Sequence, residues 1–160
     1  FRAYETGWPK ADVYFSPQMQ APVENKCPVI LYPPTFTRNV CSAPYLMREI
    51  ERLAKDKPWE WIITFHPKLT DPEIIAGYKK IAEENANVTF FEGADKLQLL
   101  HKADVMLCDS SSIILEFMFL GKNFYGDSVE LLPCIGKGEL WLPVKERDTV
   151  VLFQTLDMLA

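Results

Sequence analysis

Short apolar runs recur along this chain, and between them the apolar residues fall every three or four positions. The first pattern is typical of buried strands and the second of amphipathic helices. The runs cover residues 28–32, 59–65, 88–91, 105–108 and 123–125. Because parallel neighbours need crossover connections, strands that alternate with helices predict a parallel sheet with helices on both faces. The pattern therefore indicates an α/β fold.

Single residues locate the ends of several helices. Ser42 is placed to cap the helix after the first strand, Asp95 the short helix after the third, and Gly121 ends the apolar helix after the fourth. A loop rich in Gly and Pro at 132–143 and a final helix at 149–160 complete the pattern.

The helix after the second strand has two overlapping start signals. Thr70 and Glu73 have the spacing of a capping box. Asp71 precedes Pro72, and proline is favoured at the first helical position. Both signals predict a start within the same turn, and they leave open which side chain caps the helix.

Residues 1–27 show neither pattern and contain helix breakers, among them Pro9 and Pro17. We expect an irregular inter-domain linker or docking segment here, followed by one domain at 28–160. The first residue is Phe1 rather than Met, and the chain stops within an apparent helix. We therefore expect a piece of a longer protein.

Composition narrows the classes of function. The 160 residues are 48% hydrophobic, enough for one core, and a net charge of −5 argues against a nucleic-acid surface. The four cysteines are far apart and have no metal-binding spacing with the two histidines, so neither a metal site nor a disulfide framework is predicted. With no signal peptide and no apolar run of membrane-spanning length, we expect a cytoplasmic protein.

Polar clusters follow three of the predicted strands, at residues 35–38, 66–68 and 109–112. In an open parallel sheet, ligands bind outside the carboxyl ends of the strands, near the point where strand order reverses. The three clusters supply hydroxyls, an imidazole and two cations, a suitable set for a diphosphate. A nucleotide-diphosphate site is therefore predicted at this edge.

The third cluster consists of Asp109, Ser110, Ser111 and Ser112, between an apolar strand and an apolar helix. Exposed N–H groups and hydroxyls at such a turn favour phosphate. A serine that only caps the helix explains the same residues without a ligand. The coincidence with the other two clusters favours the phosphate site.

Four other residues are candidates with plainer alternatives. His66 could carry positive charge against phosphate or act as a general acid, or it could be a structural histidine at a strand end. Arg38 and Lys68 could bind the diphosphate or be solvated loop charges. Glu116 is a carboxylate on an otherwise apolar helix, which is costly to bury without a partner, and it could accept hydrogen bonds from a ribose.

The same residues resemble a family in their order along the chain. The pattern is Pro34-Thr35-Phe36 with Arg38 nearby, then His66-Pro67, then Ala103-Asp104 and Asp109-Ser-Ser-Ser before an acidic helix. It resembles the carboxyl-terminal half of the CDP-glycerol glycerophosphotransferases, over roughly residues 5–160. Three positions differ from the family's usual pattern: Ser110 stands where it has an aromatic residue, Thr37 intervenes before the Arg, and Asn123 replaces a Pro.

The resemblance implies a Rossmann-like domain that forms one half of a GT-B fold. Enzymes of this family transfer glycerol phosphate from CDP-glycerol to an acceptor hydroxyl in bacterial teichoic-acid synthesis and release CMP. By resemblance, Ser111, Ser112 and His66 hold the pyrophosphate, with contributions from Thr35 and Arg38, and Glu116 lies near the nucleoside.

The resemblance also implies partners. The acceptor polymer would be held with an amino-terminal half that precedes Phe1, and that missing portion would make any contact with the inner face of the membrane. The donor is the substrate, and no other cofactor is implied. The isolated fragment should have little or no turnover, because half of the acceptor-orienting constellation is missing.

Two alternatives stay open from the sequence. The same architecture could transfer a sugar from a nucleotide sugar or act on one as a UDP-sugar epimerase does. Alternatively, the domain could be non-catalytic, with the turn at 109–112 serving only as a helix cap and the apolar surface docking a partner. The second alternative predicts no nucleotide binding.

Overall fold

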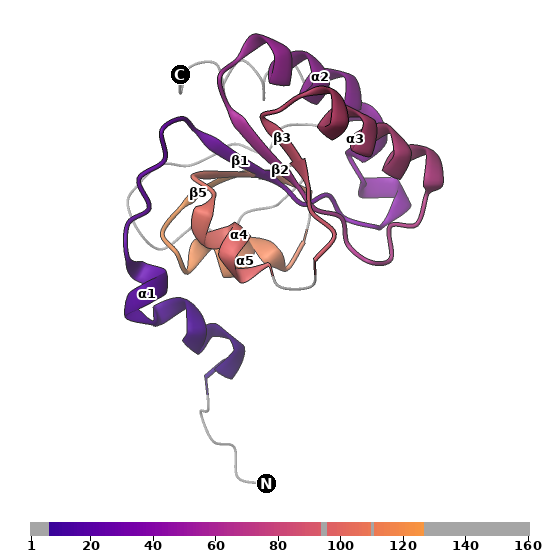
Figure 1. Cartoon of the computed structure of the whole chain (residues 1–160). Coiled ribbons are helices and arrows are strands. Elements are labelled where there is room, and N and C mark those ends of the chain that lie inside the picture. The colour runs from indigo at the N-terminus through magenta and orange to yellow at the C-terminus, as the bar shows by residue number, and fades with distance from the viewer. Residues whose placement is uncertain (1–6, 94–95, 110, 127–160) are drawn as a thin grey trace, which may run out of the picture.

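The computed structural model describes residues 7–93, 96–109 and 111–126. The described strands form one parallel sheet in the order β3-β2-β1-β4-β5 (Figure 1). Their bounds are β1 (Val29–Tyr32), β2 (Glu60–Ile63), β3 (Val88–Phe90), β4 (Val105–Cys108) and β5 (Asn123–Gly126). The predicted Rossmann-like α/β fold is confirmed, although the second strand is shorter than the apolar run at 59–65.

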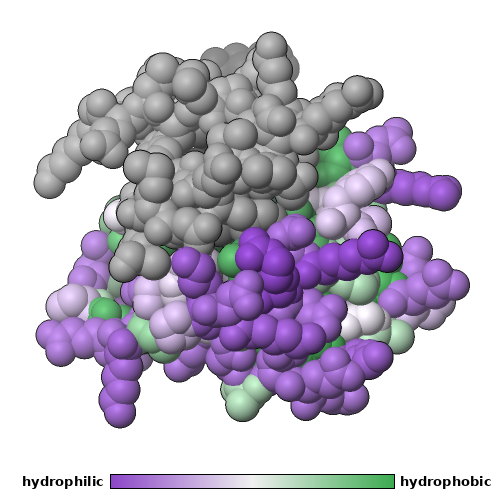
Figure 2. Space-filling view, turned by 90° about the horizontal axis from the view of Figure 1, so that it is seen from above, coloured by the Kyte–Doolittle hydropathy of each residue, from purple (hydrophilic) through white to green (hydrophobic). Residues whose placement is uncertain are grey.

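Helices cover both faces of the sheet (Figure 1). On one face lie α2 (Ala43–Asp56) and α3 (Pro72–Glu84); on the other lie α4 (Leu97–Lys102) and α5 (Ile113–Met118). Within the described residues, no helix is long and apolar enough to cross a membrane. Figure 2 shows a mostly hydrophilic surface outside the grey atoms.

Successive residues of a strand enter different cores, because side chains alternate between the two faces of a sheet. In β1, Ile30 and Tyr32 pack in the core under α2 and α3, while Val29 and Leu31 pack in the core under α4 and α5. All four are at most 2% exposed. Burying each such side chain contributes about 1.5–3 kcal/mol, so the sheet is stabilised from both sides.

The segment before β1 differs from the prediction. Residues predicted to be irregular form a 3-10 helix, η1 (Pro9–Phe15), and a short helix, α1 (Pro17–Gln20). The prolines stand at the first helical positions, where a missing N–H costs nothing. The prediction of irregular structure is therefore wrong over residues 9–20, and the role of a linker stays a prediction.

The two start signals of α3 are resolved in favour of Asp71. Its carboxylate accepts hydrogen bonds from the N–H groups of Glu73 and Ile74 at 3.0 and 3.2 Å, and Pro72 opens the helix. Ser42 precedes α2 but makes no side-chain cap, because its hydroxyl pairs with that of Tyr32 at 2.6 Å.

The turn after α5 is confirmed. Gly121 has a φ of 66°, and its N–H donates to the carbonyl of Met118 at 2.9 Å. The predicted cap Asp95, the loop at 132–143 and the final helix at 149–160 lie outside the described residues.

Candidate functional site

A pocket of about 660 Å³ opens at the carboxyl ends of β1 and β4. These strands are neighbours in space, and β2 and β5 extend the sheet in opposite directions from them. This is the switch point at which open parallel sheets bind ligands. The lining side chains that the argument uses are Lys10, Tyr14, Thr35, Phe36, His66, Lys96, Ser111, Ser112 and Glu116.

Asp109 holds two of the loops around the pocket together. It is 1% exposed, and its Oδ2 accepts hydrogen bonds from the backbone N–H of Thr35 at 2.8 Å and of Ser42 at 3.1 Å. A buried carboxylate that accepts backbone N–H groups fixes its neighbours in position. Asp109 does not line the pocket. Its contacts are those of a brace between β4 and the loop after β1.

Thr35 and Phe36 follow β1 and line the pocket on one side. Thr35 is buried and carries the N–H that Asp109 accepts. The ring of Phe36 lies 4.4 Å from that of His66, centroid to centroid, at an interplanar angle of 35°. The imidazole therefore packs against the Phe36 ring within the pocket lining.

His66 follows β2, and its orientation is set by the backbone. Its Nδ1 accepts the N–H of Lys68 at 3.1 Å, so the neutral ring carries its proton on Nε2. Partial burial lowers the pKa of His66 below its usual 6.5, and the positive charges of Lys96 and Lys68 lower it further. His66 is therefore mostly neutral at neutral pH in the absence of an anion.

Ser111 and Ser112 also line the pocket, at the start of α5. Ser112 is the N-cap residue, yet its side chain makes no capping hydrogen bond. The hydroxyl of Ser112 is therefore not used as a helix cap. Ser110 lies outside the described residues.

The two predicted loop cations do not line the pocket. Arg38 is exposed in a short 3-10 turn, η2 (Arg38–Val40). Lys68 is exposed as well, and its Nζ lies 5.2 Å from the centroid of the Phe36 ring. Lys68 thus borders the site through Phe36, while Arg38 lies farther along the loop.

Glu116 lines the pocket from α5 and has two partners on η1. Lys10 Nζ donates to Oε1, and the hydroxyl of Tyr14 donates to Oε2. These contacts explain how an otherwise apolar helix carries a carboxylate whose side chain is only 12% exposed. The sequence predicted that Glu116 needs a partner but did not identify one.

Lys96 is a pocket residue that sequence reasoning missed. It stands just before α4, and its Nζ donates to the carbonyl oxygen of Phe65 at 3.3 Å. Burial lowers the pKa of Lys96, and the charge of Glu116 partly opposes this effect. The signal available in the sequence was a cation in the loop after the third strand, at the same sheet edge as the three polar clusters.

Among the described residues, the pocket lining includes the imidazole of His66, the ammonium groups of Lys10 and Lys96, the serines Ser111 and Ser112, and the carboxylate of Glu116. Hydroxyls and cations around a concave site suit an anionic ligand with several oxygens. No group of three His, Cys, Asp or Glu side chains placed to hold a metal ion occurs in the described part of the chain.

Comparison with known proteins gives one family match. The family model for CDP-glycerol:poly(glycerophosphate) glycerophosphotransferases matches residues 1–125. No curated protein matches the chain significantly.

Two solved structures share the fold. The C-terminal domain of a glycosyl transferase group 1 family protein (LpcC) from Francisella tularensis has a TM-score of 0.58 at 17% identity, over 89% of this chain and 85% of that one. A protein from Listeria monocytogenes, provisionally described as a UDP-N-acetylglucosamine 2-epimerase, has a TM-score of 0.54 at 12% identity, over 79% of this chain. This chain covers 32% of the Listeria protein. At these identities the likeness is one of fold.

Proposed function

Since the chain belongs to the CDP-glycerol:poly(glycerophosphate) glycerophosphotransferase family, we propose that this domain binds the nucleotide diphosphate of a CDP-glycerol donor. The complete enzyme transfers glycerol phosphate to an acceptor hydroxyl and releases CMP. The acceptor is held with an amino-terminal half, as in a GT-B enzyme. The observation that carries the proposal is the pocket at the switch point, with His66, Lys96, Ser111 and Ser112 from three loops around it.

The charges in the pocket suit a diphosphate. Lys96 is half-buried, so its ammonium interacts more strongly with an anion than an exposed one would. The Ser111 and Ser112 hydroxyls, which line the same pocket, can donate to phosphate oxygens. A bound diphosphate would also offset the positive charges that lower the pKa of His66.

His66 has the catalytic part in this proposal. Its Nε2 is the nitrogen left to face a ligand, because Nδ1 is engaged by the Lys68 N–H. Once the diphosphate raises its pKa, the imidazolium stabilises the charge that develops on the departing CMP phosphate or donates a proton to it. Thr35 lines the same pocket and supports the loop that carries Phe36 against His66.

Calorimetric titration of the 160-residue chain tests the proposal. The ligands are CDP-glycerol, CDP, UDP and UDP-N-acetylglucosamine, and the variants are Ser111→Ala/Ser112→Ala, His66→Ala and Lys96→Met. We expect preference for the cytidine ligands and about a tenfold or greater loss of affinity in each variant, because each removes a hydrogen bond to a charged group.

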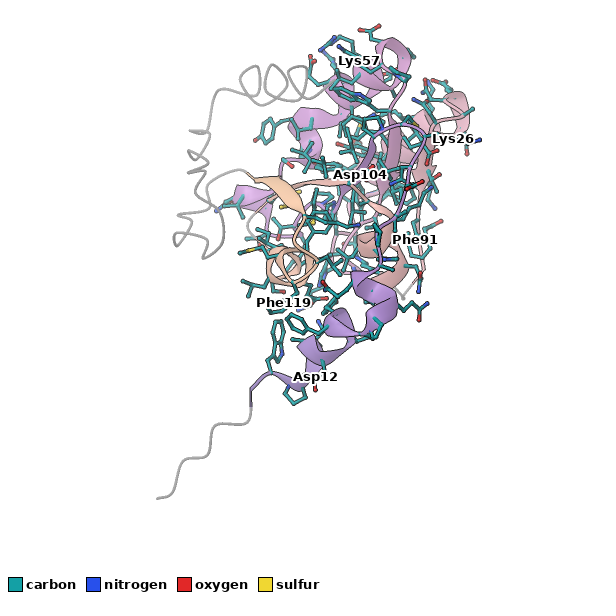
Figure 3. All side chains as sticks on the ribbon, turned by 90° about the vertical axis from the view of Figure 1, so that its left-hand side faces the viewer. Asp12, Lys26, Lys57, Phe91, Asp104 and Phe119 are labelled. Atoms are coloured by element: carbon teal, nitrogen blue, oxygen red, sulfur yellow. The ribbon has the colours of Figure 1, made fainter. Side chains whose placement is uncertain are left out.

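His101→Gln and Lys26→Met are matched controls, since neither residue lines the pocket. Lys26 lies in the segment before β1 and is exposed (Figure 3). Both controls should bind like the unaltered chain. Absence of binding by a folded protein would contradict the proposal and favour a non-catalytic interaction domain.

A nucleotide-sugar donor is the second candidate. The likeness of fold to a Listeria protein whose description names UDP-N-acetylglucosamine favours it. The same ligand panel separates the two candidates, because a nucleotide-sugar enzyme should prefer the uridine ligands.

A further inference from the structure

The segment before β1 contributes to the pocket although it precedes the predicted domain. Lys10, Val13 and Tyr14 of η1 line the pocket together with Glu116 of α5. Lys10 and Glu116 are 106 positions apart in the chain. A contact over that separation exists only because η1 folds back onto α5.

Both oxygens of the Glu116 carboxylate are engaged by this segment. Lys10 Nζ donates to Oε1 and the Tyr14 hydroxyl donates to Oε2. A carboxylate bound through both oxygens cannot rotate freely about its last bond. A carboxylate offers about four lone-pair sites, so each oxygen keeps capacity for one more donor.

Aromatic packing holds η1 in place against α5. The ring of Phe119, just after α5, has its centroid 5.8 Å from Trp8, 6.1 Å from Tyr14 and 5.4 Å from Phe15. Figure 3 shows Phe119 beside the helical segment that carries Asp12. Tyr14 itself is 4% exposed. The Tyr14 hydroxyl is thus fixed relative to the pocket before a ligand binds, whereas the Lys10 side chain is 62% exposed and is held mainly by its contact with Glu116.

The position of Glu116 relative to Ser111 and Ser112 indicates which part of a nucleotide it would contact. Glu116 stands four positions after Ser112, which corresponds to roughly 6 Å along a helix. In a nucleotide, the ribose lies about this far from the diphosphate, so a diphosphate near Ser111 and Ser112 brings the sugar hydroxyls toward the carboxylate.

We propose that Lys10 and Tyr14 are positioning residues that orient Glu116 to accept hydrogen bonds from the ribose hydroxyls, so that η1 determines the pocket's preference for ribonucleotides. This inference rests on the proposed nucleotide-binding function. The inference extends that function by assigning ribose selectivity to a segment that lies outside the predicted domain.

The test compares CDP with 2′,3′-dideoxy-CDP, which lacks both ribose hydroxyls, in titrations of the full 160-residue chain. Inorganic pyrophosphate is the third ligand. The readout is the ratio of the CDP and dideoxy-CDP affinities, in which effects on the shared diphosphate cancel. We expect a ratio of at least about tenfold for the unaltered chain, because dideoxy-CDP cannot donate the ribose hydrogen bonds to a charged acceptor.

Tyr14→Phe and Lys10→Met should each lower the ratio about fivefold, and Glu116→Gln should lower it as well. Tyr14→Phe keeps the ring that packs on Phe119, so its fold should be retained, and thermal unfolding checks this. Asp12→Asn and Tyr45→Phe are matched controls on exposed residues that do not line the pocket.

Three outcomes overturn this inference and leave the proposed function standing. The first is equal binding of CDP and dideoxy-CDP by the unaltered chain, and the second is an unchanged affinity ratio in the folded Tyr14→Phe and Lys10→Met variants. The third is tighter CDP binding by Lys10→Met, which would mean that Lys10 competes with the ribose for Glu116. Failure of the unaltered chain to bind either CDP or pyrophosphate overturns the inference and the proposed function together.

Discussion

At the scale of single residues, the surroundings of a side chain decide its part in the pocket. Asp109 and Ser111 stand two positions apart in one turn. Asp109 is buried and accepts two backbone N–H groups, whereas Ser111 lines the pocket. Residue type and spacing predicted both as ligand contacts. The structure makes Asp109 a brace, because its carboxylate points at the loop after β1.

His66 gives a prediction about pH. We expect its imidazole to titrate below pH 6.5, because partial burial and the charges of Lys96 and Lys68 disfavour the protonated form. Lys96→Met should raise the midpoint by removing one like charge. An NMR titration measures this directly, since the chain has only two histidines and His66→Gln identifies the signal.

The lowered pKa of His66 also predicts the direction in which a bound diphosphate changes that pKa. An anionic diphosphate favours the imidazolium, so binding should raise the pKa of His66 and be accompanied by proton uptake. Affinity for CDP-glycerol should therefore increase as the pH falls through this pKa. A midpoint at or above 6.5 in the unliganded chain, or no upward movement with ligand, would contradict the assignment.

At the scale of elements, helices with a clear amphipathic period were predicted well. The face of α2 that the apolar spacing selects is buried, with Ile50 and Leu53 at 0% exposure. The start of α3 shows where sequence alone left a choice. Two adjacent residues could cap it, and only backbone geometry selects Asp71.

Urea unfolding can test whether Asp71, and not Thr70, caps α3. Asp71→Ala should lower the free energy of unfolding by about 1 kcal/mol, because two N–H groups in the first turn lose their acceptor. Thr70→Ala is the matched control and should leave stability nearly unchanged, since the capping side chain is that of Asp71. The reverse order would restore the capping-box interpretation.

At the scale of the whole molecule, the order of the strands creates the site. The order β3-β2-β1-β4-β5 places β1 beside β4, although the sequence separates them by two strands. The loops after these strands therefore meet at one edge, and Asp109 joins them. The polar clusters were predicted to converge at this edge, and the pocket contains residues from all three.

A stability measurement can test whether the segment before β1 packs as part of the folded domain. Met19 on α1 is 4% exposed and packs in the core under α4 and α5. Met19→Ala should lower the free energy of unfolding by about 2–3 kcal/mol, within the range for truncating a core methionine. Gln18→Ala, on the exposed side of the same helix, should change it little. An equally small effect of Met19→Ala would mean that the segment is only a linker.

The sequence by itself determined the strands and helices from β1 to β5, the parallel α/β class and the sheet edge at which the pocket opens. These features depend on local periodicity and turn chemistry, which neighbouring residues already contain. The tertiary structure alone decided which distant groups meet: the backbone N–H of Thr35 with the Asp109 carboxylate across 74 positions, and the side chains of Lys10 and Glu116 across 106. Such pairs depend on how elements pack, and no local pattern records them. For that reason the contribution of η1 to the pocket emerged only from the fold.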